Sequence, residues 1–369
     1  MRRFSGLACF LIAVSLLSMS AACSKSAPEN PFNYSFIKQL HLKQQSGKPH
    51  SDYKAFYVLT EDFEPAVESA SDVSSIRDVL KFASSVGAKY GVPWTHFVDV
   101  NALSPAFVSE DQQLKTSCQA MIADLKAMSS AGDDCELHLH GPLVPQLMDF
   151  ASAQDKLHIK GSAVENAQPY RQRQSFFFHS FYRSGYRQLV ASLTYAKKLL
   201  EQVIYDGQKE VIAFRPGGWD HGSTSQDTFL YFEALSASGL MANSGLSIGH
   251  FGGTDWRIGN DPGRNLAAVM VGEKRLFEVS PTAGPGGYVN PVSPSDLAKL
   301  AGSARDEMPV IVAVYHLGAL QQTAGSEADI NKQREALEEH FKNVAELASR
   351  KIVYPITLRA LLEIMSEQQ

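Results

Sequence analysis

Residues 55–64 read Ala-Phe-Tyr-Val-Leu-Thr-Glu-Asp-Phe-Glu, a short apolar run that ends in acidic residues. A run of this length and composition predicts a buried β-strand. Because side chains alternate along a strand, Thr60, Asp62 and Glu64 share one face. Two carboxylates on one face of a strand end repel each other unless a cation lies between them. The stretch therefore predicts either an acidic loop without a role or one part of a cation site.

Strand and helix signals alternate along the rest of the chain. This alternation is typical of a mainly parallel sheet covered by helices. Seven or eight strand signals favour a closed or nearly closed α/β barrel over an open sheet, and no G-x-G-x-x-G loop follows the first strand. The strands are predicted at 55–60, 96–100, 136–140, 211–214, 240–242, 276–279, 310–315 and 352–355, and the helices at 73–90, 113–128, 187–203, 229–238, 295–302, 331–348 and 358–366.

The composition is that of a globular protein, with 369 residues of which 44% are hydrophobic and 20% charged. The chain has 34 Lys and Arg against 39 Asp and Glu, a formal net charge of −5. A mildly acidic chain without a block of basic residues lacks the cationic surface that nucleic-acid binding needs, so we expect no nucleic-acid partner. We expect one domain over 51–369, and the sequence leaves its oligomeric state open.

The first residues have the three-part plan of a secretory signal: two arginines, an apolar run over 7–17 and small residues after it. The run is shorter than the roughly 20 residues of a transmembrane helix. Cys23 follows two alanines, which resembles a bacterial lipoprotein signal, in which this cysteine is lipidated. We therefore expect a signal peptide over 1–22 and a lipidated Cys23 with a polar tether over 23–50. The exported protein would be anchored to a membrane and would face the periplasm or the cell exterior. The alternative is an ordinary cleavable signal with an incidental cysteine.

If the protein is exported, the two cysteines of the domain are able to form a disulfide. Cys118 and Cys135 are an even pair in an oxidising compartment, which predicts a disulfide between them. The bond would stabilise the fold by roughly 3 kcal/mol in the loop-entropy model. The alternative is two buried free thiols.

The strand predicted at 136–140 carries His138 and His140 on one face. Two imidazoles side by side on a strand are a common way to bind a transition metal. Glycine and proline follow, so the pair stands at a strand end, where the chemistry of α/β barrels is located. The pattern favours a metal site over two structural histidines.

Two further strand ends carry reactive groups. Arg215 follows the strand at 211–214 and begins the turn Arg-Pro-Gly-Gly-Trp. An arginine there can hold a carboxylate with two N–H donors, and Trp219 offers an apolar face for a sugar ring. His316 follows a strongly apolar strand and is a candidate acid or base, with Tyr315 beside it as a second candidate for the sugar subsite. The alternatives are a surface turn with a buried tryptophan and a core histidine.

The four strand ends follow one another in the order of the motifs of the NodB-like polysaccharide deacetylases, carbohydrate esterase family 4, which the sequence resembles over about residues 55–360. The family patterns are T-F-D-D, H-[ST]-x-x-H, R-x-P-[YF]-G and L-x-H. Here the first motif is T-E-D-F-E, with Phe63 in place of the second, metal-binding aspartate, and Glu64 is the candidate replacement because it shares the face of Asp62. The second motif is H-L-H, with Val144 at the position of the family's last histidine.

The resemblance implies an α/β fold, a distorted (β/α)7-type barrel in a single domain, and a divalent metal, with Zn²⁺ as the expected ion. The implied activity is removal of N- or O-acetyl groups from a cell-surface or extracellular polysaccharide. Two alternatives stay open: a catalytically inactive glycan-binding lipoprotein on the same scaffold, and a metal-dependent hydrolase of another C–N bond. The implied roles are Asp62 as base, Arg215 as its positioning residue, His316 as acid, and Asp62 and/or Glu64 with His138 and His140 as metal ligands.

Overall fold

The structure is a computed structural model of the 369-residue chain. It describes residues 36–65, 67–144, 146–147, 178–181, 185–222, 225–245, 265–282, 298–299, 301–302, 307–317 and 327–368. The predicted signal peptide and Cys23 lie outside these residues, as does half of the helix predicted at 295–302. Within the described part of the chain, no helix has the length and apolarity needed to cross a membrane.

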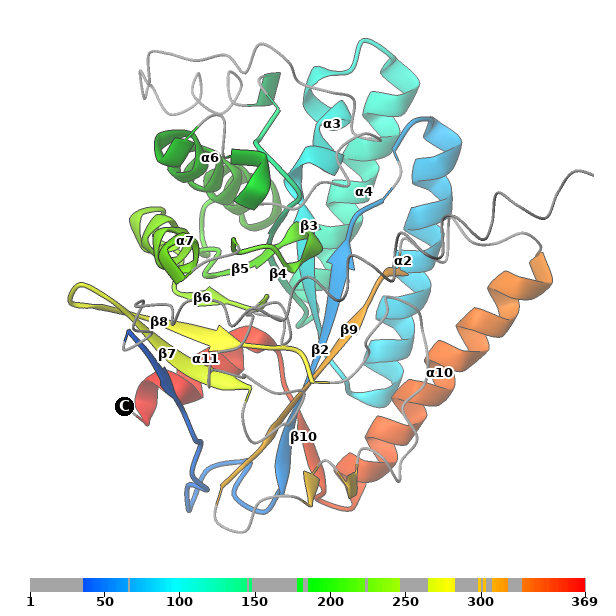
Figure 1. Cartoon of the computed structure of the whole chain (residues 1–369). Coiled ribbons are helices and arrows are strands. Elements are labelled where there is room, and N and C mark those ends of the chain that lie inside the picture. Colours follow the sequence, from blue (N-terminus) through cyan, green and yellow to red (C-terminus); the bar gives the residue numbers. More distant parts are fainter. Residues whose placement is uncertain are drawn as a thin grey trace, which may run out of the picture. The chain divides into compact units, whose positions relative to one another are not determined.

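Seven parallel strands form the centre of the molecule, in the pairing order β9-β2-β3-β4-β5-β6-β8 (Figure 1). No ladder joins β8 to β9 among the described residues, but Thr282, just past β8, donates its backbone N–H to the Val312 carbonyl of β9 at 2.9 Å. The ring is therefore nearly complete but open at this seam, and the predicted distorted (β/α)7-type barrel is confirmed. The strands are β2 (Ala55–Phe63), β3 (Trp94–Asp99), β4 (Asp134–Leu139), β5 (Ala213–Pro216), β6 (Ala242–Asn243), β8 (Lys274–Val279) and β9 (Val310–Tyr315).

Three more strands extend the sheet. β10 (Val353–Pro355) pairs in parallel with the start of β2. β7 (Leu266–Val271) forms an antiparallel hairpin with β8, and β1 (Ile37–Gln39) pairs with β7. The prediction of a tether over 23–50 is therefore wrong at its end: β1 is part of the sheet and Leu42 is buried, so the domain includes residues before 51.

Most of the helices cover the outer side of the barrel, and long helices that follow one another from 70 to 237 lie side by side (Figure 1). The first of the long helices begins at a capping box between Ser69 and Asp72 and ends at Gly91, which has a left-handed φ of 68°. The helices are α2 (Ala70–Tyr90), α3 (Pro105–Val108), α4 (Gln112–Ser130), α6 (Gly185–Tyr205), α7 (Ser225–Ala237), α10 (Glu327–Ser349) and α11 (Leu358–Glu367), with short 3₁₀ turns at Val100–Leu103, Phe178–Phe181 and Gly217–Trp219.

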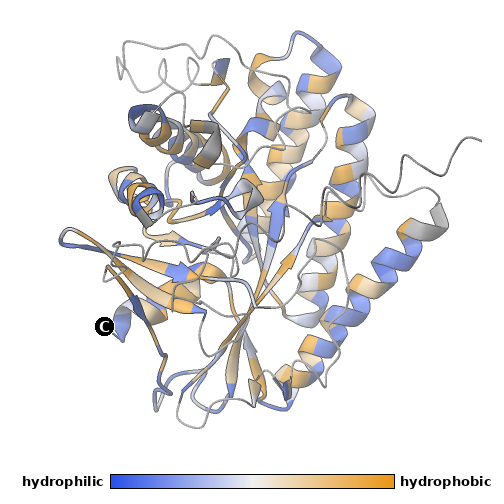
Figure 2. Cartoon of the chain, viewed as in Figure 1, coloured by the Kyte–Doolittle hydropathy of each residue, from blue (hydrophilic) through white to orange (hydrophobic). Residues whose placement is uncertain are grey.

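The barrel interior is apolar near the amino ends of the strands and polar near their carboxyl ends. Phe56 and Val58 of β2 belong to one buried cluster with Phe97 of β3 and Leu361 of α11, so α11 packs against the interior residues. Figure 2 shows the hydrophobic residues along β2 and β9 and the mixed surface of α10. Two residues further along the same face of β2, the side chains become Thr60 and then Asp62. The alternation predicted for residues 55–64 therefore places the polar residues at one end of a filled barrel.

All eight predicted strands are present, with ends that differ by a few residues. The sequence analysis missed β1 and β7. β7 forms a hairpin with β8, and the two residues between Val271 and Lys274 form its turn. One of them, Gly272, has a φ of 60°, and a glycine in a two-residue loop is a sequence signal for such a hairpin.

The predicted disulfide is wrong, because Cys118 and Cys135 are both free, buried thiols. Cys118 lies near the start of α4, and the helix from there to its end at Ser130 spans about 18 Å. Cys135 lies at the start of β4, close to that far end, whereas a disulfide needs Cα atoms within about 7 Å. Burial raises the pKa of Cys118 to about 11 and raises the pKa of Cys135 as well, so both thiols stay protonated.

Candidate active site

An arginine–carboxylate pair lies inside the barrel near the carboxyl ends of β2 and β5. Arg215 Nη1 donates to Asp62 Oδ1 at 2.6 Å, and both side chains are buried. Burial would raise the pKa of Asp62, but the charge of Arg215 and the contact with His316 outweigh it and hold that pKa well below its usual range. Asp62 is therefore an anion at any physiological pH.

Three further hydrogen bonds from Nε and Nη2 fix the position of the guanidinium. Nε donates to the Ser244 carbonyl at 2.7 Å, and Nη2 donates to Thr60 Oγ1 at 2.9 Å and to Ser244 Oγ at 2.8 Å. Its Cζ atom lies 4.1 Å from the ring centroid of Phe97 and 5.6 Å from that of Trp219. The planar fork is held in its plane by hydrogen bonds and on its faces by two rings.

Glu64 and the two strand-end histidines meet at the same end of the barrel. The Nε2 atoms of His138 and His140 each lie 2.7 Å from Glu64 Oε1. His138 Nδ1 lies 2.8 Å from the Arg215 carbonyl, an acceptor only, so Nδ1 carries a proton and Nε2 faces Glu64. Burial would raise the pKa of Glu64, but its contacts with His138 and His140 lower it overall.

The donor set fits a divalent metal. One ligand atom from each of Glu64, His138 and His140 lies within 4.8 Å of the others. In its neutral form His138 turns a lone pair on Nε2 toward a carboxylate oxygen, and two acceptors at 2.7 Å repel unless a proton or a cation lies between them. Two imidazoles and one carboxylate are a known ligand set of catalytic zinc, and the bond from Nδ1 to a carbonyl is the usual support of a ligating histidine.

His316 joins the two groups. Its Nε2 lies 3.4 Å from Asp62 Oδ2, on the side away from Arg215. A second set of possible ligand atoms, from Asp62, Glu64 and His316, also lies within 4.8 Å. Burial would lower the pKa of His316, but its contact with Asp62 and the negative charges of Asp62 and Glu64 raise it overall. The contact with Asp62 therefore favours the cationic form of His316.

The two aromatic candidates have different positions. Trp219 is partly exposed and lies against Arg215, and its φ of 58° is in the left-handed region, which costs about 1 kcal/mol or more for a residue other than glycine. Tyr315 is buried on the outer face of β9, where its ring packs against Trp94 and His340. The structure therefore does not place Tyr315 with the other predicted site residues.

Two residues of the site were missed by the sequence analysis. Asp99 is buried at the end of β3, opposite His138 in the ladder, and burial raises its pKa, an effect that His138 and His140 partly offset. The strand-end rule applied to the run His-Phe-Val-Asp would have found it. Ser244 follows β6, the two-residue strand predicted at 240–242, but the strand-end rule was not applied there.

No family model matches the sequence, and no curated protein matches it significantly. The solved structures that resemble the chain include a carbohydrate esterase of family 4. This enzyme, from Streptomyces lividans in complex with acetate, is 11% identical with a TM-score of 0.36, over 81% of this chain and 91% of that one. A protein from Mycobacterium smegmatis assigned as a polysaccharide deacetylase is 12% identical with a TM-score of 0.46, over 90% and 96%. A 4-alpha-glucanotransferase from Thermococcus litoralis is 9% identical with a TM-score of 0.48, over 84% and 40%. Because these scores are below 0.5, we take the fold from the strand ladders themselves.

Proposed function

We propose that this protein is a metal-dependent carbohydrate deacetylase that removes N- or O-acetyl groups from a polysaccharide. The observation that carries the proposal is the convergence of three groups at the carboxyl ends of the strands: the Asp62–Arg215 pair, the ligand set of Glu64 with two histidines, and His316. The order of these motifs along the chain, which resembles that of the family 4 carbohydrate esterases, supports the same reaction.

In this proposal Glu64, His138 and His140 hold the metal, and Asp62 is the general base. A bound divalent cation would lower the pKa of water toward neutrality and polarise the acetyl carbonyl. Asp62 accepts the proton of the attacking water through Oδ2, because Oδ1 already accepts from Arg215. Arg215 keeps the carboxylate ionised and fixes its direction.

His316 is the general acid. The contact with Asp62 raises its pKa and so favours the protonated form, which would donate a proton to the departing amine or alcohol. The 3.4 Å distance between His316 Nε2 and Asp62 Oδ2 supports this pairing of acid and base. Trp219, partly exposed above Arg215, is the proposed apolar face for the sugar ring.

The test is acetate release from acetylated glycans by the purified protein. We expect activity that is lost after treatment with a chelator and restored by Zn²⁺ or another divalent cation. Metal analysis of the purified protein gives an independent readout. Activity that survives complete removal of the metal would contradict the proposal.

Two matched substitutions separate the roles of the carboxylates. Asp62→Asn should abolish turnover and leave metal affinity close to that of the wild type, whereas Glu64→Gln should weaken metal binding itself. Glu339→Gln, at an exposed position on α10, is the control and should change neither. If Asp62→Asn released the metal and Glu64→Gln kept it, the two roles would be exchanged.

Substrate length separates this proposal from hydrolysis of another C–N bond. An enzyme that acts on a polymer uses binding energy along the chain, so its kcat/KM should fall on short oligosaccharides and fall further on a monosaccharide. An equal kcat/KM on all of them would favour the hydrolase of a small amide. Glycan binding without turnover and without metal would favour the inactive, glycan-binding alternative.

We also propose that the protein is exported and anchored through a lipid on Cys23. The support is the signal pattern of the first 22 residues and the cysteine that follows it. In the native host, Cys23→Ala should move the protein from the membrane fraction to the soluble exported fraction. Retention of the variant in membranes would contradict lipid anchoring.

A further inference from the structure

A buried pair of side chains, one acidic and one basic, lies on the outer face of the barrel, on the opposite side of β2 from the proposed base. Glu61, the residue before Asp62, is fully buried, and its Oε2 lies 2.5 Å from Nδ1 of His96. The two residues are partners in the β2–β3 ladder, so the side-chain contact repeats a backbone pairing. Nε2 of His96 lies 3.7 Å from Oδ2 of Asp133, and the indole of Trp94 stacks on the imidazole with the ring centroids 5.7 Å apart.

Burial acts on both residues of the pair: it raises the pKa of Glu61, an effect that His96 partly offsets. Burial would lower the pKa of His96, but its contacts with Asp133 and Glu61 outweigh burial and raise that pKa to about 9. Buried ion pairs are weak contributors to stability, because desolvation offsets most of the attraction, and an apolar pair of similar volume is often equally stable.

The position of the pair along β2 suggests what it does. The described β2–β9 ladder ends at Glu61, which pairs with Tyr315, whereas the β2–β3 ladder continues to Phe63. Among the described strands, the part of β2 that carries Asp62 is therefore held by β3 alone. The contact of Glu61 with His96 adds a side-chain link between β2 and β3 at the residue where the β2–β9 ladder stops.

We propose that Glu61 and His96 form a positioning pair that aims Asp62 and Glu64 at Arg215 and at the metal ligands. Neither residue touches the substrate, and both act through the backbone of β2. The inference rests on the proposed function for its catalytic readout. Misplacement of a reacting group by about 1 Å can reduce a rate by about 100-fold, so the pair needs to move Asp62 only slightly to matter.

The test is the double variant Glu61→Leu/His96→Leu in the otherwise intact chain. The matched control is the double variant Tyr57→Phe/His340→Phe. It removes another buried polar contact on the same face of β2, four residues before Glu61, and this contact joins β2 to α10 rather than to β3. We expect the first double variant to keep a melting temperature near that of the wild type, to lose about tenfold or more in kcat with little change in KM, and to bind metal more weakly. The control should keep wild-type kcat and metal affinity.

A purely structural role would lower the melting temperature and leave kcat and metal affinity of the folded protein unchanged, which would overturn the proposal. If the double variant does not fold, Glu61→Leu alone decides in the same way, because it removes the side-chain contact with His96. A crystal structure of whichever variant folds gives a readout that needs no activity. The proposal requires a longer separation between Asp62 Oδ1 and Arg215 Nη1 than the present 2.6 Å, and an unchanged separation would overturn it even if the wild type proved inactive on glycans.

Discussion

Gly217 is the residue whose size decides where His140 can lie. A Cβ atom at this position would be 2.4 Å from the imidazole and 2.7 Å from Cα of His140, closer than any relaxed contact. Gly217→Ala therefore forces His140 away from Glu64. We expect metal affinity to fall by about tenfold or more while the protein stays folded, as measured by metal titration and by circular dichroism.

The control for this substitution is Gly302→Ala, where the nearest atom to the added Cβ is the Ala298 carbonyl oxygen at 3.3 Å, in a helical turn. That variant should bind metal as the wild type does. Equal metal affinity in both variants would mean that His140 is not a ligand.

At the scale of elements, the contact between β2 and α10 predicts a pH dependence of stability. His340 of α10 is buried, its Nε2 lies 2.5 Å from the Tyr57 hydroxyl, and burial lowers its pKa to about 4. The unfolded chain takes up the proton near pH 6.5, so the contribution of a neutral His340 is complete above pH 6.5 and is lost as the pH falls toward 4. The loss amounts to about 3 kcal/mol in the free energy of unfolding.

His340→Gln tests this, because glutamine can still accept from the Tyr57 hydroxyl but does not titrate. Urea unfolding at pH 7, 5.5 and 4 should show the wild type losing more stability than the variant. Parallel pH profiles for wild type and His340→Gln would contradict the prediction.

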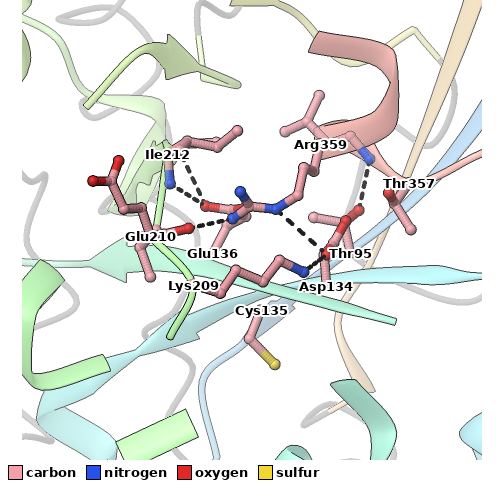
Figure 3. A network of polar contacts seen from close by, with 12 residues as sticks. Thr95, Asp134, Cys135, Glu136, Lys209, Glu210, Ile212, Thr357 and Arg359 are labelled. Carbon is pink, nitrogen blue, oxygen red and sulfur yellow. Dashed lines mark hydrogen bonds and ion pairs between the residues drawn. The ribbon is translucent and has the colours of Figure 1, made fainter. Parts of the chain in front are cut away.

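A second contact between elements joins α11 to the start of β4 (Figure 3). Arg359 Nη2 donates to Glu136 Oε1 at 2.7 Å, and Glu136 Oε2 accepts the backbone N–H groups of Ile212 and Ala213 at 2.8 Å each. Burial raises the pKa of Glu136 to about 7, although Arg359 lowers it. Removal of the guanidinium leaves a buried carboxylate without its nearest cation.

We therefore expect Arg359→Ala to reduce the free energy of unfolding by about 3 kcal/mol, measured by urea denaturation at pH 8. Addition of Glu136→Gln in the same chain should restore part of the loss, because glutamine carries no charge to desolvate. Arg350→Ala, which removes an exposed ion pair with Glu346, is the control. An equal loss in the free energy of unfolding for both variants would show that the buried pair contributes no more than an exposed one.

At the scale of the whole molecule, the free thiols report on the integrity of the fold. Cys118 and Cys135 are both buried, the first on helix α4 and the second on strand β4. For a chain that begins after residue 23 and is purified without reductant, a thiol reagent should detect two thiols after denaturation and essentially none before. Two thiols missing after denaturation would indicate the disulfide that the structure excludes.

The sequence by itself determined the class of fold and the four strand ends. The apolar runs are short and alternate with helical patterns, and a local period of two or 3.6 residues is a property of the chain alone. The same period put Asp62 and Glu64 on one face and His138 and His140 on one face, because side-chain alternation needs no knowledge of neighbours. The motif order then indicated which strand ends to compare.

Only the tertiary structure decided which of these groups touch. That Glu64 meets both histidines, that Asp62 is held by Arg215, and that Tyr315 faces the helices depend on strand register and barrel closure. The structure also separated the two cysteines and revealed the pair of Glu61 and His96, a contact between strands 35 residues apart in sequence. Such contacts could not be predicted because the distance between two side chains depends on how all the intervening elements pack, whereas the periodicity of one strand depends only on its own residues.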